Sequence, residues 1–186
     1  MAYTGQVIEN PVSGERITFN KTAADTNGEL LSITLELSPD GAVPGLHVHP
    51  SQEERFEIVS GRMKIRKGMK TIVAEAGDVV TVEPGIAHKF QNIGDEPVVA
   101  NVEVRPAGRM EELFETAVEL AEEGRTNKKG MPKPLDFAVF TKEFRNEVVG
   151  AFPPVWVQRA TLAPLVAIAE RRGHGERYQP LRPTYA

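Results

Sequence analysis

The chain has 186 residues, a formal net charge of −4 and no cysteine. This length suits one domain, or one domain with an appendage, and is enough to bury about 70% of the surface that the unfolded chain would expose. The lack of cysteine excludes disulfides, thiolate metal ligands and a cysteine nucleophile. The acidic balance lacks the basic patch typical of nucleic-acid binding, so we expect no nucleic-acid partner.

The amino-terminal segment has neither the basic start nor the apolar run of a signal peptide. No apolar stretch approaches the roughly 18 residues that a membrane span needs. We therefore expect no membrane partner and a soluble, cytoplasmic protein.

Residues 1–107 are expected to form short strands separated by turns. The segment Glu29–Leu37 alternates apolar and polar residues with the two-residue period of a strand that buries one face. Glycine and proline residues separate most of the further candidates, which are Gln6–Ile8, Arg16–Asn20, Phe56–Val59, Met63–Ile65, Thr71–Ala74, Val79–Val82, His88–Asn92 and Val98–Val104. Many short strands at regular spacing predict a mainly β fold, an antiparallel sandwich or small barrel.

Residues 108–186 are expected to form a helical extension. Three segments place apolar residues at helical spacing: Arg109–Glu123, Phe137–Val149 and Val155–Arg172. Gly150 is a stop signal for the second helix, and Pro164 should break or kink the third. His174 follows in a polar run, where we expect a surface loop. The apolar faces of these helices should pack on the barrel or on a partner subunit.

Three of the four histidines fall in one pattern, Gly41-x5-His47-x-His49-x4-Glu54-x6-Gly61 followed by Gly77-x7-Gly85-x2-His88-x3-Asn92. Nearby prolines and a glycine discourage helix around His47 and His49, so the backbone there should be extended. Residues i and i+2 of a strand point to the same face, about 7 Å apart along the chain. Both imidazoles can therefore converge on one ion.

At these residues the sequence resembles the cupin superfamily, whose two short motifs carry three histidines and a glutamate as metal ligands. The first motif matches in spacing from Gly41 to Gly61. In the second, the family's proline would fall at Glu83, and here it stands one place later at Pro84, which we interpret as a small change in a turn. The resemblance covers roughly residues 28–105. It implies a double-stranded β-helix, the cupin jelly-roll barrel, with four ligands for one divalent metal ion: His47, His49, Glu54 and His88.

Glu53 and Glu54 compete for the carboxylate position. Adjacent strand residues face opposite sides, so one of the two points inward. The six-residue gap to Gly61 in the motif selects Glu54, with Glu53 as the alternative. Three neutral imidazoles and one carboxylate leave a net charge of +1 and an open coordination position, as a catalytic centre requires. Nitrogen and oxygen ligands suit several transition metals; we favour Fe, Ni or Mn, with Zn, Co and Cu as alternatives.

Three apolar residues are candidates for a substrate pocket. Phe56 and Ile58 share the inward face of a strand with Glu54, and Phe90 follows His88 by two. A charged metal ion in such a cavity suits an apolar or aromatic substrate that chelates through oxygen. The alternative is that the two phenylalanines simply fill the barrel.

The resemblance is to quercetinase-like cupins, and it implies a mononuclear-metal dioxygenase with a small organic substrate, dioxygen as the second substrate, and a homodimeric assembly. Glu54 would also be the base that takes the substrate proton. One alternative is a non-redox isomerase, cyclase or lyase, since the same ion can polarise a carbonyl. The other is a module that binds a metal or small ligand without turnover, because fold alone does not fix function.

Overall fold

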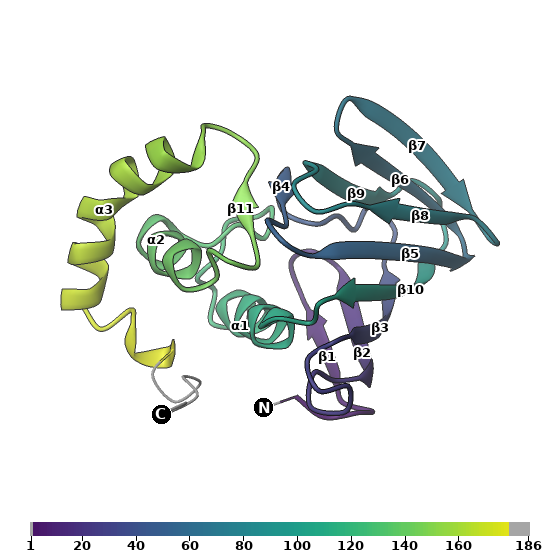
Figure 1. Cartoon of the computed structure of the whole chain (residues 1–186), viewed down its shortest axis with the longest axis horizontal. Helices are drawn as coiled ribbons and strands as arrows, with labels where there is room; N and C mark the ends of the chain where they lie inside the picture. The colour runs from purple at the N-terminus through teal and green to yellow at the C-terminus, as the bar shows by residue number, and fades with distance from the viewer. Residues whose placement is uncertain (1, 179–186) are drawn as a thin grey trace.

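The computed structural model describes residues 2–178, which form a β-barrel followed by helices (Figure 1). The strands are β1 Val7–Asn10, β2 Glu15–Lys21, β3 Leu31–Leu37, β4 His47–Val48, β5 Glu53–Ser60, β6 Arg62–Lys67, β7 Lys70–Glu75, β8 Val79–Val82, β9 His88–Asn92, β10 Val98–Arg105 and β11 Val149–Gly150. The helices are α1 Met110–Glu122, α2 Pro134–Glu143 and α3 Val155–Arg171, followed by the short 3₁₀ helix Glu176–Tyr178. The predicted mainly β fold with a helical end is confirmed.

The strands form two antiparallel sheets, ordered β1-β2-β3-β10-β5-β8 and β11-β4-β9-β6-β7. Val102 of β10 pairs with Ile33 of β3 on one side and with Phe56 of β5 on the other. All three side chains are buried. The alternation predicted for Glu29–Leu37 is confirmed, because every second residue of β3 from Leu31 onward is buried. This alternation gives the barrel its apolar interior.

Gly61 makes the tight connection between β5 and β6. Its φ is +81°, a conformation that residues with a Cβ rarely adopt. A Cβ at this position would also lie 2.9 Å from the carbonyl oxygen of Pro97, which is too close for any side chain. The turn therefore requires glycine, and it fixes the register of the strand that carries Glu54.

The helices lie to one side of the barrel, with α1 nearest to it and α3 at the outer edge (Figure 1). The amide of Gln52 donates to the carbonyl oxygens of Pro106 and Ala107, at 3.1 and 3.0 Å, and holds the chain between β10 and α1. Gln6 donates to Glu115 of α1 at 3.0 Å and joins the helix to the first strands.

The predicted helix Phe137–Val149 is too long. Helix α2 begins at Pro134 and ends at Glu143, and Val149 and Gly150 form β11 instead. Strand β11 pairs with β4, whose edge offers unpaired backbone groups. Backbone pairing to a distant strand overrides the local helical pattern here.

Two further expectations concern the end of the chain. Helix α3 continues through Pro164 without a break, and it bends in Figure 1, as a kink at proline predicts. His174 lies in a turn after α3, as expected, but its side chain is only partly exposed, because its Nδ1 lies 2.8 Å from buried Asp136 and 2.6 Å from Arg125. This cluster ties the end of α3 to α1 and α2.

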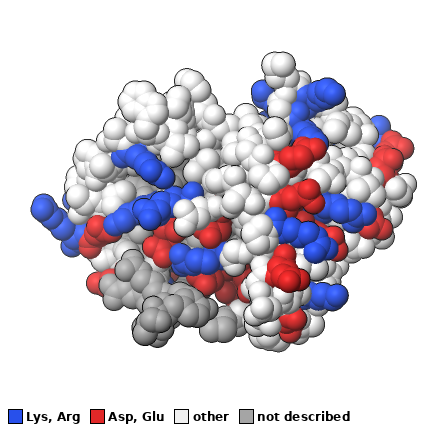
Figure 2. Space-filling view, in the orientation of Figure 1, with Lys and Arg blue, Asp and Glu red and all other residues white. Residues whose placement is uncertain are grey.

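Within residues 2–178, no helix combines the length and the apolar character needed to cross a membrane. Figure 2 shows positive and negative side chains interspersed on the face that it draws, with a largely uncharged area over the start of α3. Exposed apolar side chains gather in that segment, including Phe152 and Trp156.

Candidate metal centre

The four predicted ligands come from three strands that meet at one end of the barrel. His47 lies in β4 and pairs directly with His88 of β9. His49 follows one residue after β4 ends, and Glu54 lies in β5 of the facing sheet. His49, Glu54 and His88 are at most 5% exposed. Four chemically active side chains are thus collected from segments up to 41 residues apart.

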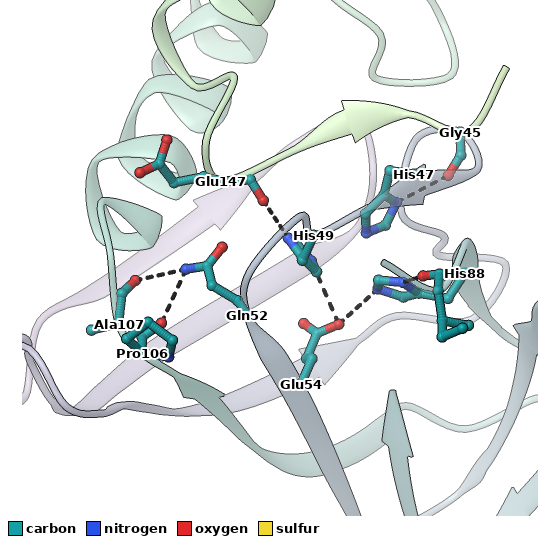
Figure 3. Close-up of polar contacts among 10 residues, drawn as sticks. Gly45, His47, His49, Gln52, Glu54, His88, Pro106, Ala107 and Glu147 are labelled. Atoms are coloured by element: carbon teal, nitrogen blue, oxygen red, sulfur yellow. Dashed lines mark hydrogen bonds and ion pairs between the residues drawn. The ribbon is translucent and has the colours of Figure 1, made fainter. Parts of the chain in front are cut away.

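The side chains converge in space. The imidazole centroids of His47, His49 and His88 lie 4.3 to 5.2 Å apart, and each ring offers a nitrogen within 4.8 Å of those of the others. Oε2 of Glu54 lies 2.8 Å from Nε2 of His88 and 3.8 Å from Nε2 of His49 (Figure 3). The arrangement predicted from the spacing is therefore the one observed, although ligation itself stays a prediction.

The backbone fixes which nitrogen of each imidazole faces the others. Nδ1 of His49 lies 2.6 Å from the carbonyl oxygen of Glu147, and Nδ1 of His88 lies 3.1 Å from that of Ile86. Nδ1 of His47 lies 3.3 Å from the carbonyl oxygen of Gly45 (Figure 3). A carbonyl only accepts, so each Nδ1 carries a proton, and each Nε2 is the nitrogen that faces the cluster, where that of His88 lies beside Oε2 of Glu54. Histidine ligands of metals are held in this way.

Electrostatics favour a neutral His47 beside an ionised Glu54, because the pKa values of both groups are lowered. Burial, with the charges of His88 and His49, lowers the pKa of His47 to about 3. Burial raises the pKa of Glu54, but the hydrogen bond from His88 and the charges of the three imidazoles outweigh it, so the pKa is lowered. Burial lowers the pKa of His88, and the hydrogen bond and charge of Glu54 more than offset this and raise it. Without a cation, His88 and Glu54 share a proton.

The cluster opens into a cavity of about 190 Å³ that both halves of the molecule enclose. Barrel residues on its wall include Ile17, Ile33 and Val102, and extension residues include Leu113 and Phe140. The helices therefore close the mouth of the barrel over the predicted metal centre.

Two of the three predicted pocket residues line the cavity, and the third does not. Phe56 and Phe90 line the cavity, with ring centroids 5.2 Å apart. Ile58 is 1% exposed, packs in the barrel core, and is not among the lining residues. Glu54 lines the cavity, and Glu53 does not. The register of β5 thus favours Glu54 as the carboxylate.

Sequence reasoning missed two polar features of this cavity. The carbonyl of Glu147 has no side-chain signal, because any residue supplies a carbonyl. Glu15 lines the cavity from β2, and the pattern of that strand held a signal: Glu15 stands in phase with Ile17 and Phe19, both buried. A charged residue at an inward position of a strand points to a function or a partner.

A small antiparallel barrel with a histidine and carboxylate cluster inside it defines a class of single-ion metal sites, and comparisons with known proteins place the chain more closely. Residues 33–104 match the family model described as the cupin domain. The barrel is a cupin domain, so the predicted membership of the cupin superfamily and the double-stranded β-helix are confirmed.

Individual relatives are distant. A segment of 46 residues is 44% identical to an uncharacterised protein of Streptomyces coelicolor, covering 25% of this chain and 44% of that protein. The match thus spans less than half the length of this curated relative.

Solved structures similar to this chain align over about half of it. A predicted oxalate decarboxylase from Thermotoga maritima is 22% identical over 55% of this chain and 92% of that chain, with a TM-score of 0.49. An uncharacterised conserved protein with a double-stranded β-helix domain from Klebsiella pneumoniae is 20% identical over 58% of this chain and 84% of that chain, with a TM-score of 0.44. Oxalate decarboxylase from Bacillus subtilis is 27% identical, and the alignment covers 54% of this chain and 27% of that chain, with a TM-score of 0.45.

Proposed function

We propose that the chain is a metal-dependent enzyme, a mononuclear-metal dioxygenase acting on a small organic substrate that chelates through oxygen and is enolisable or aromatic. One observation carries this proposal. The Nε2 atoms of His47, His49 and His88 and the carboxylate of Glu54 converge at the wall of a mostly apolar cavity that is partly open to solvent. Structural metal sites are closed by protein ligands, whereas catalytic sites keep an open coordination position that a substrate can reach.

The donor set fits a divalent transition metal. Each Nδ1 faces a backbone carbonyl and each Nε2 is free of one, so the imidazoles are oriented as ligands before any ion binds. We favour Fe, Ni or Mn, with Zn, Co and Cu as alternatives, since nitrogen and oxygen ligands suit all six. Such an ion would supply a Lewis acid and, where it is redox active, a path for electrons between substrate and dioxygen.

The chain's own residues supply the rest. Glu54 is positioned to take the proton of an enol or phenol that enters the site, which would need hydrogen-bond reach to that proton. The apolar wall that includes Phe56 and Phe90 excludes water and accommodates dioxygen, which is itself apolar. Both atoms of dioxygen would enter the product and the substrate would supply the electrons, so no external reductant is needed.

Oxygen consumption tests the proposal. Protein loaded separately with Fe, Ni or Mn is supplied with enols and catechols in an oxygen electrode, with His49→Ala protein as the control. We expect uptake coupled to product in at least one metal form and none with the variant. Turnover under strict anaerobiosis would replace this function with a non-redox isomerase, cyclase or lyase. Tight binding without product in every form would replace it with a binding module.

A further inference from the structure

Glu15 stands at an unusual place in the barrel. It lies in β2, paired with buried Leu37 of β3, and its side chain lines the cavity described above. The next two residues in phase, Ile17 and Phe19, are buried core residues. A carboxyl group therefore occupies a position that the strand pattern reserves for an apolar side chain.

The carboxyl group is partly buried, and this partial burial has little compensation. Ser13 donates its hydroxyl to Oε2 of Glu15 at 2.6 Å. Among residues 2–178, no lysine or arginine forms an ion pair with Glu15. Burial raises the pKa of Glu15 to about 7; the hydroxyl of Ser13 lowers it, and the charge of Glu54 raises it further. Burying a carboxyl group without a counter-ion reduces stability, so its presence needs another explanation.

The cavity wall offers few other polar side chains. Outside the metal centre, the polar side chains among the described lining residues are Glu15 and Thr141. The hydroxyl of Thr141 is already donated to the carbonyl oxygens of Phe137 and Ala138, at 2.8 and 3.1 Å. The oxygen of Thr141 can still accept a hydrogen bond, but Glu15 is the one carboxyl group among the described lining residues outside the predicted metal centre.

The sheet order separates Glu15 from the metal centre. Glu15 lies in β2 and Glu54 in β5, and β3 and β10 run between them. Three strand spacings of about 4.8 Å put the two backbones on the order of 14 Å apart along the curved sheet. Both side chains line the same cavity, and the charge of Glu54 acts on Glu15 there, so one molecule in the cavity can contact both groups through two separate polar groups.

We infer that Glu15 is a second anchor for the substrate, which binds a hydroxyl or amino group separate from the group that reaches the predicted metal centre. The substrate is accordingly a mostly apolar molecule that carries an oxygen-chelating group and, apart from it, a hydrogen-bond donor. The chelating end rests on the proposed function; the donor end rests on Glu15 alone. Glu15 then determines specificity, because a ligand lacking the donor leaves this carboxyl group without its partner.

Two probes that differ by one hydroxyl group test the inference. Zinc-loaded protein is titrated calorimetrically with 4-phenylcatechol and with the same molecule carrying a hydroxyl at the far end of its second ring. We expect the hydroxylated probe to bind about tenfold more tightly to the wild type, as a hydrogen bond to a carboxyl group would give. In Glu15→Leu the ratio should fall to about one. A ratio that survives in Glu15→Leu, or the failure of both probes to bind the zinc-loaded wild type, would overturn the inference.

A second measurement needs no metal. If Glu15 is kept for binding, Glu15→Leu should leave the Tm of the apoprotein unchanged or raise it, because an uncompensated carboxyl group is removed. If Glu15 serves to hold Ser13 in its turn, Glu15→Leu and Ser13→Ala should lower the Tm together, and the inference fails. Zinc content separates this result from the proposed function: a wild type that binds no zinc overturns the function, while the apoprotein still tests Glu15.

Discussion

The two halves of the cavity differ in what they contribute. The barrel supplies all four predicted ligands and the second carboxyl group, Glu15, from strands held in a hydrogen-bonded register. The extension supplies apolar wall from α1, α2 and β11, and it reaches the predicted metal centre through backbone groups: the carbonyl of Glu147 beside His49 and the pairing of Gly150 with His47. The chemistry is therefore built on the rigid sheets, while the extension sets the shape of the space above it.

The largest expected effect is on the barrel half. His49→Ala and Glu54→Ala should each reduce metal content from about one ion per chain to near zero, because a site of four ligands is lost when one is removed. Elemental analysis of protein purified without chelator measures this, and circular dichroism checks that the β-rich fold is intact. Glu53→Ala is the matched control, since Glu53 does not line the cavity. Loss of metal from Glu53→Ala instead would place the carboxylate ligand on the other face of β5.

Truncating an aromatic side chain of the cavity wall should cost more stability in the barrel than in the extension. Phe56 of β5 is fully buried, so Phe56→Ala should reduce the free energy of unfolding by about 3–5 kcal/mol. Phe140 of α2 is only partly buried, and Phe140→Ala should cost clearly less stability while enlarging the cavity. Urea denaturation of both variants makes the comparison. Equal losses would mean that the extension is as much a part of the barrel core as β5.

The metal centre should make the apoprotein sensitive to acid. The pKa of His47 in the fold, about 3, lies below its ordinary value of 6.5, so the unfolded chain binds this proton more readily. Stability should fall as pH drops from about 6.5 towards 3, on the order of 1 kcal/mol per pH unit. The lowered pKa of Glu54 acts in the same direction, while the raised pKa of His88 opposes both.

Denaturation of the apoprotein at pH 7 and pH 5 measures this dependence, with His47→Gln as the comparison. The variant should lose less stability between the two pH values than the wild type. A wild type that is equally stable at both would show that His47 titrates normally and is not held neutral by the barrel.

The extension should act on the metal centre through β11. The amide of Ala151 donates to the carbonyl oxygen of Leu46 at 3.1 Å, just beside the pairing of β11 with β4. Ala151→Pro removes this donor and should loosen the carbonyl of Glu147 that orients His49. We expect metal affinity to fall about 10–100-fold, as for other partners of metal-bound histidines. Ala151→Ser keeps the amide and is the control. Equal metal affinities in the two variants would mean that the extension only lines the cavity and does not orient His49.

The sequence predicted the barrel half far better than the extension. Alternation predicts β3, and the convergence of His47 and His49, because the two-residue period of a strand is a local property of the chain; Glu54 and His88 were added by the resemblance of the motif spacing to the cupin superfamily. Strand β11 was missed because it exists only through its pairing with β4, about 100 residues earlier. Periodicity cannot reveal a partner supplied by a distant edge.

The sequence also could not show which inward-facing residues of a strand line the cavity and which pack in the core. Phe56 and Ile58 have the same phase in β5, yet only Phe56 lines the cavity, because the barrel narrows to packed side chains beyond it. The role of the helices as a lid depends on tertiary packing, which an amphipathic pattern indicates without naming the surface it covers.

The smallest expected effect concerns α3, which differs from the rest of the molecule in burying little of itself. Within α3, Ala169 is the buried residue, while Trp156 is 73% exposed and Phe152, just before the helix, is 86% exposed. The homodimer implied by the family stays a prediction, and these side chains offer the apolar surface that a second copy would cover. Phe152→Ser combined with Trp156→Ser should shift a dimer to monomers in light scattering with little change in Tm. Met69→Ser, on a fully exposed barrel turn, is the control; a wild type that scatters as a monomer of about 20.4 kDa would contradict the dimer.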